Sequence, residues 1–128
     1  MKEEVSASNR LVLRHELSSL GDKCKCIVEI GVCRNGKDSF THVLLNGKPS
    51  DCVYLGIDLQ DKSFLDNSGK NVRTIKTDSM ERQQVFAKLE GLGHKQIDLL
   101  FIDGFHSVNM AINDWQYTER LSQHGTVI

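Results

Sequence analysis

An aspartate and a histidine stand three residues apart, directly after an apolar run near the end of the sequence. The stretch LLFIDGFH, residues 99–106, places Asp103 after Ile102 and His106 beyond a glycine and Phe105. Aspartate can ligate a hard divalent cation, and an imidazole can act as a general base near neutral pH. A surface turn with a polar pair would have the same spacing. The elements around these residues must decide between a site and a turn.

A glycine-containing loop is the second candidate. The segment VEIGVCRNGKDS, residues 28–39, holds Glu29, Gly31 and Gly36 between an apolar run and a helical pattern. Glycine lets the backbone approach a ligand closely, and the helix that follows offers free N–H groups. The dinucleotide pattern G-x-G-x-x-G is absent, because Cys33 stands at its second glycine. A tight strand-to-helix turn explains the glycines equally well.

Two further acidic positions end apolar runs. Asp58 closes VYLGID, where an acid after the second strand can accept hydrogen bonds from both ribose hydroxyls of a nucleoside. Its alternative role is to cap a turn. Asp78 and Ser79 follow the third run, and the order DSME predicts a capping box in which Asp78 and Glu81 cap a helix.

Short apolar runs alternate with helical patterns along the chain. Continuous apolar runs of this length are typical of parallel strands buried on both faces. The predicted strands cover residues 26–30, 53–57, 72–76, 97–102 and 125–128, and the predicted helices cover 8–20, 38–46, 79–91 and 107–121. The polar segment 60–71 is expected to hold a turn or a short helix.

The last predicted helix has a clear apolar pattern. Val108, Ala111, Ile112 and Trp115 fall at helical spacing, so this face is expected to pack on the sheet. Asp114 is then expected on the solvated face of the same helix.

Strand–helix alternation predicts an α/β fold with right-handed crossovers between parallel strands. The expected architecture is a Rossmann-like doubly wound parallel sheet with strand order 3-2-1-4-5. Residues 1–25 form an N-terminal helical segment in this prediction, and residues 26–128 form one domain. Such sheets bind ligands at the carboxyl ends of the strands, where the order reverses. That point lies between strands 1 and 4, which end near Gly31 and Asp103.

Composition limits the class of protein. The chain has 128 residues, 39% hydrophobic residues and a formal net charge of −1, which suits one domain with a real core. No basic surplus indicates nucleic-acid binding, no apolar run approaches the ~18–20 residues of a membrane span, and no signal peptide is evident. We therefore expect a cytoplasmic protein. Its four cysteines lack the paired spacing of a zinc site, so reduced and mostly buried thiols are expected.

Together the segments resemble a known family. VEIGVCRNGKDS, YLGID, KTDSME, DLLFIDGFHSVNMAINDW and LSQHGTVI, in this order, resemble the class I S-adenosylmethionine-dependent methyltransferases. The likeness is strongest to the small-molecule and sugar O-methyltransferase group whose strand 4 reads I-D-G-x-H, which is related to the catechol-type O-methyltransferases. It covers about residues 26–128.

The resemblance implies where S-adenosylmethionine binds. Glu29 and Gly31 would lie against its methionyl part, and Asp58 would hold the ribose hydroxyls. Asp78 and Ser79 would lie beside the adenine. The cofactor-binding residues implied are Glu29, Gly31, Gly36, Ser39, Asp58, Asp78, Ser79 and Phe105, the last bordering cofactor or substrate.

The resemblance also implies the catalytic residues. Asp103 would lie at the methyl-transfer centre, and in metal-using relatives it is a magnesium ligand. His106 takes the position of the catalytic lysine of catechol-type relatives. Since a sulfonium methyl is already activated, the protein must mainly align the acceptor oxygen and remove its proton. A metal ion would assist by lowering the hydroxyl pKa. The expected acceptor is a small hydroxylated molecule, sugar-like or aromatic.

Relatives continue past strand 5 with an acidic residue and two more strands, whereas this sequence stops at Ile128. We therefore expect a sheet truncated before its last two strands, in a fragment of a longer enzyme or a minimal domain. An exposed strand 5 edge would favour a homodimer. Two alternatives stay open: a catalytically inactive S-adenosylmethionine-binding or interaction module and, less favoured because of the displaced glycines, an NAD-binding oxidoreductase.

Overall fold

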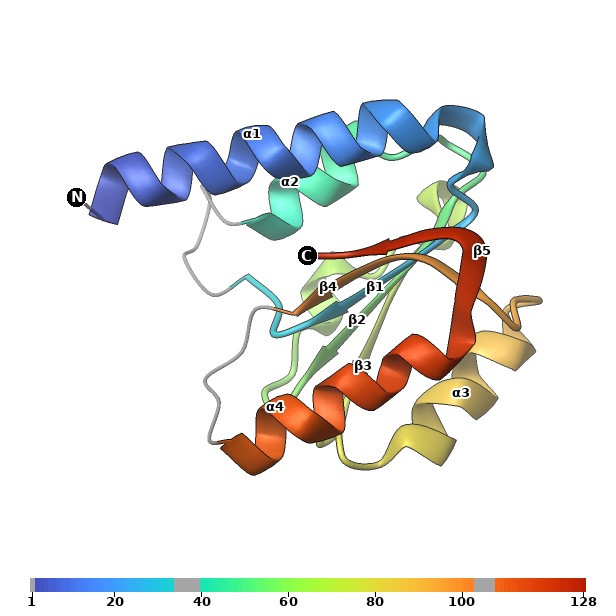
Figure 1. Cartoon of the computed structure of the whole chain (residues 1–128). Coiled ribbons are helices and arrows are strands. Elements are labelled where there is room, and N and C mark those ends of the chain that lie inside the picture. Colours follow the sequence, from blue (N-terminus) through green and yellow to red (C-terminus); the bar gives the residue numbers. More distant parts are fainter. Residues whose placement is uncertain (1, 34–39, 103–107) are drawn as a thin grey trace.

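Five parallel strands form a single sheet in the order β3-β2-β1-β4-β5 (Figure 1). The structure is a computed structural model that describes residues 2–33, 40–102 and 108–128. The predicted fold class and strand order are confirmed. The strands are β1 (Cys26–Ile30), β2 (Val53–Asp58), β3 (Val72–Lys76), β4 (Ile97–Ile102) and β5 (Leu121–Val127).

Helices cover both faces of this sheet. One face carries the first two helices and the other carries the last two (Figure 1). They are α1 (Lys2–Leu20), α2 (Phe40–Gly47), α3 (Arg82–Gly91) and α4 (Val108–Trp115). The polar segment 60–71 holds two short 3-10 turns, Ser63–Leu65 and Ser68–Lys70, as expected.

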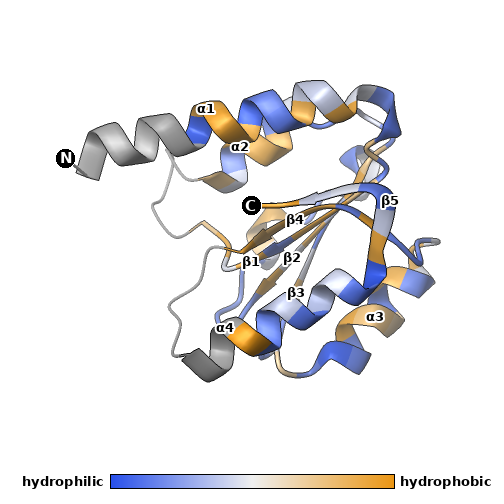
Figure 2. Cartoon of the chain, in the orientation of Figure 1, coloured by the Kyte–Doolittle hydropathy of each residue, from blue (hydrophilic) through white to orange (hydrophobic). Residues whose placement is uncertain are grey.

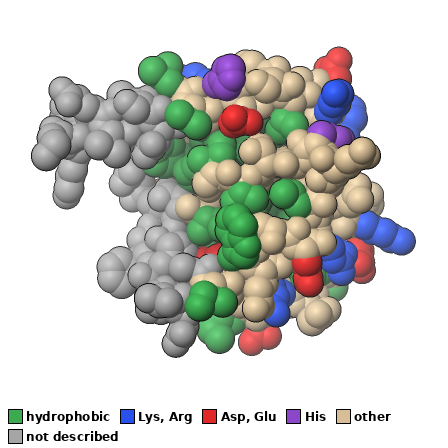
Figure 3. Space-filling view, in the orientation of Figure 1, with side chains coloured by type: hydrophobic (Ala, Val, Ile, Leu, Met, Phe, Trp, Pro, Cys, Tyr) green, Lys and Arg blue, Asp and Glu red, His purple; other side chains and the backbone are tan. Residues whose placement is uncertain are grey.

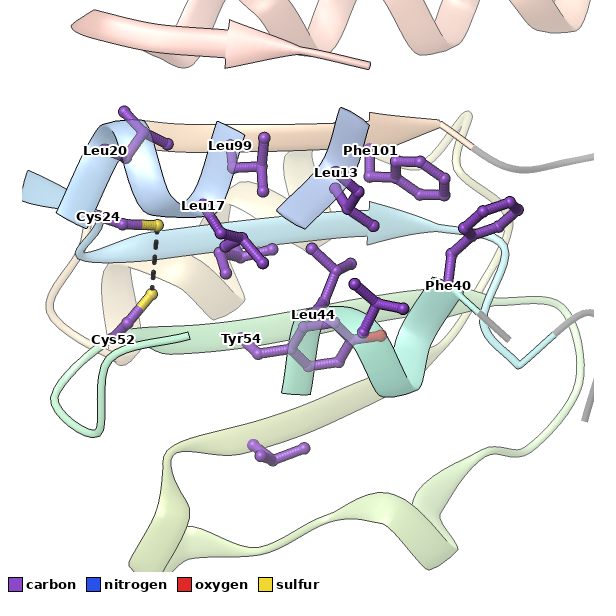
Figure 4. Packing of buried hydrophobic residues seen from close by; sticks show 13 residues of the cluster. Leu13, Leu17, Leu20, Cys24, Phe40, Leu44, Cys52, Tyr54, Leu99 and Phe101 are labelled. Atoms are coloured by element: carbon purple, nitrogen blue, oxygen red, sulfur yellow. Dashed lines mark hydrogen bonds between the residues drawn. The ribbon is translucent and has the colours of Figure 1, made fainter. Parts of the chain in front are cut away.

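A separate hydrophobic cluster fills each side of the sheet. On the first side, Leu13, Leu17 and Leu20 of α1 lie over the strands, and Phe40 of α2 meets Phe101 of β4 with ring centroids 5.3 Å apart (Figure 4). The second cluster joins α3 to the opposite side through Val85, Phe86 and Leu89. Burial on both sides explains why β1, β2 and β4 are mainly apolar in sequence.

Hydropathy follows the same arrangement. The central strands are mainly hydrophobic, whereas the helices carry both polar and apolar residues (Figure 2). Within the described residues, no helix combines the length and the apolar character needed to cross a membrane.

The end of the chain differs from the prediction. Strand β5 begins at Leu121 rather than at residue 125, and α4 stops at Trp115, followed by a 3-10 turn over Gln116–Arg120. Leu121 pairs with Ile97 of β4, and the register shifts before the pairing resumes. The sequence did not predict the first part of β5 because the residues after Leu121 are polar. An edge strand can be polar, since it does not need a continuous apolar run.

The predicted orientation of α4 is wrong. Ile112 and Trp115 are 56% and 61% exposed, whereas Asp114 and Tyr117 are completely buried. Hydrophobic side chains gather on the visible surface between α1 and α4 (Figure 3). Polar bonds to the loop after β3, described below, decide which face of α4 turns inward.

The predicted capping box before α3 is also wrong. The helix begins at Arg82, and its N-cap residue Glu81 makes no side-chain capping bond. Asp78 instead accepts the N–H of Met80 at 2.9 Å. The carboxylate therefore closes a turn ahead of the helix rather than capping the helix itself.

Candidate functional site

The chain turns sharply at the carboxyl end of β1. Gly31 has a positive φ of 89°, a conformation that glycine adopts without steric cost. Its N–H donates to the carbonyl of Ile57 at 2.9 Å. The next N–H, that of Val32, donates to Asp58 Oδ2 at 2.9 Å. The loop after β1 is therefore tied to the end of β2, the two places where the sequence predicted cofactor contacts.

The buried carboxylate of Glu29 supports the loop after β1 through hydrogen bonds. Glu29 is 0% exposed, and its Oε1 accepts hydrogen bonds from the hydroxyls of Thr41 and Tyr54, each at 2.6 Å. The Thr41 hydroxyl in turn accepts the N–H of Cys33 at 2.7 Å. Glu29 thus joins β1, β2, α2 and the loop, and its predicted contact with the methionyl part of a cofactor stays a prediction.

Sequence reasoning missed Thr41, Tyr54 and Gly56 as parts of this support. A Cβ at Gly56 would lie 2.7 Å from both the Tyr54 hydroxyl and Val32 Cγ2. Only glycine leaves room there for the tyrosine beneath the loop. A glycine inside an apolar strand is the one signal that could have indicated such a close approach.

The carboxylate of Asp58 is held by two backbone N–H groups and can accept further hydrogen bonds. Its Oδ2 accepts the Val32 N–H, and its Oδ1 accepts the N–H of Gln60 at 2.8 Å. The side chain is half-buried at the end of β2. A carboxylate offers about four acceptor positions, so two backbone bonds leave capacity for a pair of neighbouring hydroxyls. The predicted ribose contact stays a prediction.

The loop after β3 lies next along the same end of the sheet. Ser79 is buried, its hydroxyl donates to Asp114 Oδ1 at 2.6 Å, and its carbonyl accepts the Tyr117 hydroxyl at 2.6 Å. Its side chain therefore points toward α4. Met80 beside it is 60% exposed, and Leu59 after β2 is 65% exposed. Two exposed apolar side chains at this end could contact the faces of a nucleobase.

The remaining predicted site residues, Gly36, Ser39, Asp103, Phe105 and His106, lie outside the described residues. The strands leading to them are described. Ile30 of β1 and Ile102 of β4 are register partners, so the chain leaves both strands side by side at the predicted switch point. Among the described residues, no group of three or more His, Cys, Asp or Glu side chains could hold a metal ion.

Three of the four cysteines, Cys24, Cys26 and Cys52, are separate from this end of the sheet. Cys24 and Cys52 precede β1 and β2, and their Sγ atoms lie 3.7 Å apart (Figure 4). Burial raises the pKa of the nearby Cys26 thiol to about 12. All three are buried free thiols, which confirms the expectation of structural cysteines.

With this geometry established, comparison with known proteins identifies the family. A family described as "Methyltransferase domain" matches residues 28–128. The chain belongs to this methyltransferase family. The match spans β1 to β5 and so includes both the Glu29 support and Asp58. It confirms the sequence-based identification at the level of the methyltransferase, but not the catechol-type subgroup. A search of curated proteins finds no match.

Solved structures share the fold at low sequence identity. MycE methyltransferase from the mycinamycin biosynthetic pathway, in complex with Mg and SAH, superposes with a TM-score of 0.69 at 16% identity, over 88% of this chain and 31% of that one. A cyclopropane-fatty-acyl-phospholipid synthase-like protein from Lactobacillus casei gives a TM-score of 0.53 at 17% identity, over 85% of this chain and 45% of that one. The chain thus spans less than half the length of either protein.

Ionisation of Tyr54 provides a test of the Glu29 support. Burial, and next the adjacent Glu29 carboxylate, raise the pKa of Tyr54 well above its usual value. Above about pH 10 the unfolded chain releases this proton while the folded protein retains it, so the free energy of unfolding falls as pH rises, by about 1.4 kcal/mol per pH unit. Tyr54→Phe should remove this component. We expect a smaller loss of stability in the variant than in the wild type between about pH 9 and about pH 11, measured by urea denaturation.

The informative quantity is the slope of the free energy of unfolding against pH. Losing the hydroxyl also lowers stability by about 1 kcal/mol at all pH values below the transition. Tyr117, whose pKa burial also raises, contributes equally to both proteins. Parallel stability curves for wild type and Tyr54→Phe would contradict the assignment.

Proposed function

We propose that this chain is the S-adenosylmethionine-binding core of a methyltransferase that methylates a hydroxyl group of a small acceptor. The observation that carries the proposal is the Asp58 carboxylate, fixed by the Val32 N–H at 2.9 Å where the glycine loop leaves β1, in a chain of the methyltransferase family. Such a carboxylate would accept hydrogen bonds from the two ribose hydroxyls of a nucleoside.

The residues present fit the other parts of this cofactor. Leu59 and Met80 are exposed apolar side chains after β2 and β3, suited to the faces of adenine. Asp78 lies in the same loop as Met80, and its carboxylate can accept a hydrogen bond from the exocyclic amine of adenine. The positive φ of Gly31 lets the backbone approach the methionyl part. Binding of SAH by MycE supports the same cofactor class here.

S-adenosylmethionine supplies an activated methyl group on a sulfonium when bound. In the proposal, His106 accepts the proton of the acceptor hydroxyl, and Asp103 helps to hold the acceptor, with Mg²⁺ as its candidate partner. Both assignments rest on the sequence resemblance. The structure of MycE with Mg, SAH and mycinamycin VI supports a small-molecule acceptor and a metal ion.

The alternatives give different outcomes. A catalytically inactive binding module would bind S-adenosylhomocysteine without turnover. An NAD-binding oxidoreductase, which the family match disfavours, would be stabilised by NAD instead. The cytoplasmic location stays a prediction.

Asp58→Ala tests the cofactor site. We expect this substitution to weaken S-adenosylhomocysteine binding roughly 10- to 100-fold, since it removes the acceptors of two hydroxyl hydrogen bonds that would together contribute about 1.4–2.8 kcal/mol. Isothermal titration calorimetry measures the affinity. The matched control is Asp61→Ala in the same loop, whose carboxylate is hydrogen-bonded locally by the N–H and the side chain of Ser63. Equal affinities for Asp58→Ala and wild type would reject the ribose assignment.

His106→Ala tests the enzymatic assignment. Removing a general base should lower turnover on a panel of hydroxylated acceptors by roughly 10²- to 10⁴-fold while leaving S-adenosylhomocysteine affinity unchanged. The assay is run with and without Mg²⁺, and His94→Ala, in the turn before β4, serves as the control. Unchanged turnover in His106→Ala would show that another group takes the proton.

Strand β5 supports the proposal of a homodimer. It is the last strand in the sheet order, and its described residues pair with β4 alone. An open edge favours pairing with a second chain. Light scattering at high protein concentration should give twice the mass of the chain, and a monomer would refute this arrangement.

A further inference from the structure

We propose that Asp114 of α4 is a positioning residue that fixes the loop Asp78–Glu81 for recognition of the adenine base. This inference rests on the proposed function, because it assigns a role within the same cofactor site. It concerns a residue that the sequence placed on a solvated helix face.

Ser79 is bound at both its side chain and its carbonyl. Its hydroxyl donates to Asp114 Oδ1 at 2.6 Å, and its carbonyl accepts the Tyr117 hydroxyl at 2.6 Å. With both groups fixed to the α4 region, the backbone of Ser79 has little freedom to rotate. The residues on either side, Asp78 and Met80, therefore take their directions from α4.

Further hydrogen bonds, made by Asn113, orient the carboxylate of Asp114. Asn113 Nδ2 donates to Asp114 Oδ1 at 3.1 Å and lies 3.4 Å from the Ser79 hydroxyl. Asn113 Oδ1 accepts from Arg82 Nη1 at 2.7 Å. The arginine belongs to the first turn of α3, so the loop is held between α3 and α4.

The burial of this network indicates a role beyond packing. Asp114 is 0% exposed and Asn113 is 9% exposed, while Ile112 and Trp115 on the same helix are turned toward solvent. Burying a carboxylate is costly unless it is hydrogen-bonded. An apolar residue at position 114 would bury hydrophobic surface without that cost. The helix instead places its polar face against the loop, which is explained if the loop must be held in one conformation.

The conformation held is one that suits a purine. Asp78 Oδ1 accepts the Met80 N–H at 2.9 Å, which curls the loop about the carboxylate. Asp78 remains available to accept from the exocyclic amine of adenine, and Met80 presents an exposed apolar surface beside it. A loop released from Asp114 would lose the directional contact first, because hydrogen bonds depend more steeply on geometry than apolar contacts do.

The experiment compares binding of S-adenosylhomocysteine with binding of S-inosylhomocysteine, which has a carbonyl oxygen in place of the exocyclic amine. Wild type should prefer the adenine ligand by roughly tenfold or more, since a site built to hydrogen-bond a group rejects the analogue that lacks it. Ser79→Ala and Asp114→Ala should each weaken adenine-ligand binding roughly tenfold and reduce the preference toward unity. Asp114→Asn, which keeps an acceptor oxygen, should restore most of it.

Ser122→Ala is the matched control. Ser122 is 8% exposed, and its hydroxyl donates to the buried Asp98 at 2.6 Å, so the same type of bond is lost at the amino end of the sheet. This variant should lose stability without losing base preference. The double variant Ser79→Ala/Asp114→Ala should bind no more weakly than Asp114→Ala, because the two residues share one interaction.

Hydrogen–deuterium exchange without ligand completes the test. The amide of Met80 should exchange faster in Ser79→Ala than in wild type, and at the wild-type rate in Ser122→Ala. Wild-type exchange together with wild-type base preference in Ser79→Ala would overturn the positioning role, even if Asp114→Ala failed to fold. If wild type bound neither ligand, the proposed function and the adenine role would fall together, while the exchange rates would still report whether Asp114 holds the loop.

Discussion

The buried carboxylate of Glu29 is the interaction on which the candidate site depends. Through the hydroxyls of Thr41 and Tyr54 it joins α2 and β2 to the strand that carries it, and through Thr41 it reaches the N–H of Cys33. An ion of this kind is stable in the interior only when hydrogen-bonded. Its bonds therefore fix the loop after β1 and the elements around it as one unit.

Other carboxylates use the same principle at both ends of the sheet. At the amino end, Asp98 Oδ2 accepts the N–H groups of Lys25 and Cys26 at 2.7 and 3.0 Å, which ties β4 to the start of β1. At the carboxyl end, Asp58 binds the N–H of Val32. Parallel strands leave unpaired N–H groups where they begin and end. Aspartates at those positions satisfy them, and Asp58, unlike Asp98, lies at the end of the sheet where a ligand could share its oxygens.

The sequence predicted the sheet well because the signal for each strand lies in the residues of that strand. The stretches that form β1, β2 and β4 are mainly apolar, and burial on both faces is the cause of that pattern. The stretch VRTIK of β3 alternates instead, and it was the weaker signal. The prediction failed for β5 and for α4. The edge strand β5 is not buried on both faces, and the face of α4 is decided by hydrogen bonds from Ser79 and Tyr117 that no periodicity encodes.

The sequence by itself determined the fold class, the strand order, the family and the position of Asp58, because each depends on residue types repeated at fixed spacing along one chain. Only the tertiary structure decided that Glu29 supports the loop, that Gly56 makes room for Tyr54, and that Asp114 turns inward. Most of these contacts join residues that are far apart in the sequence, and the energies of all of them depend on directions and distances that folding alone brings about.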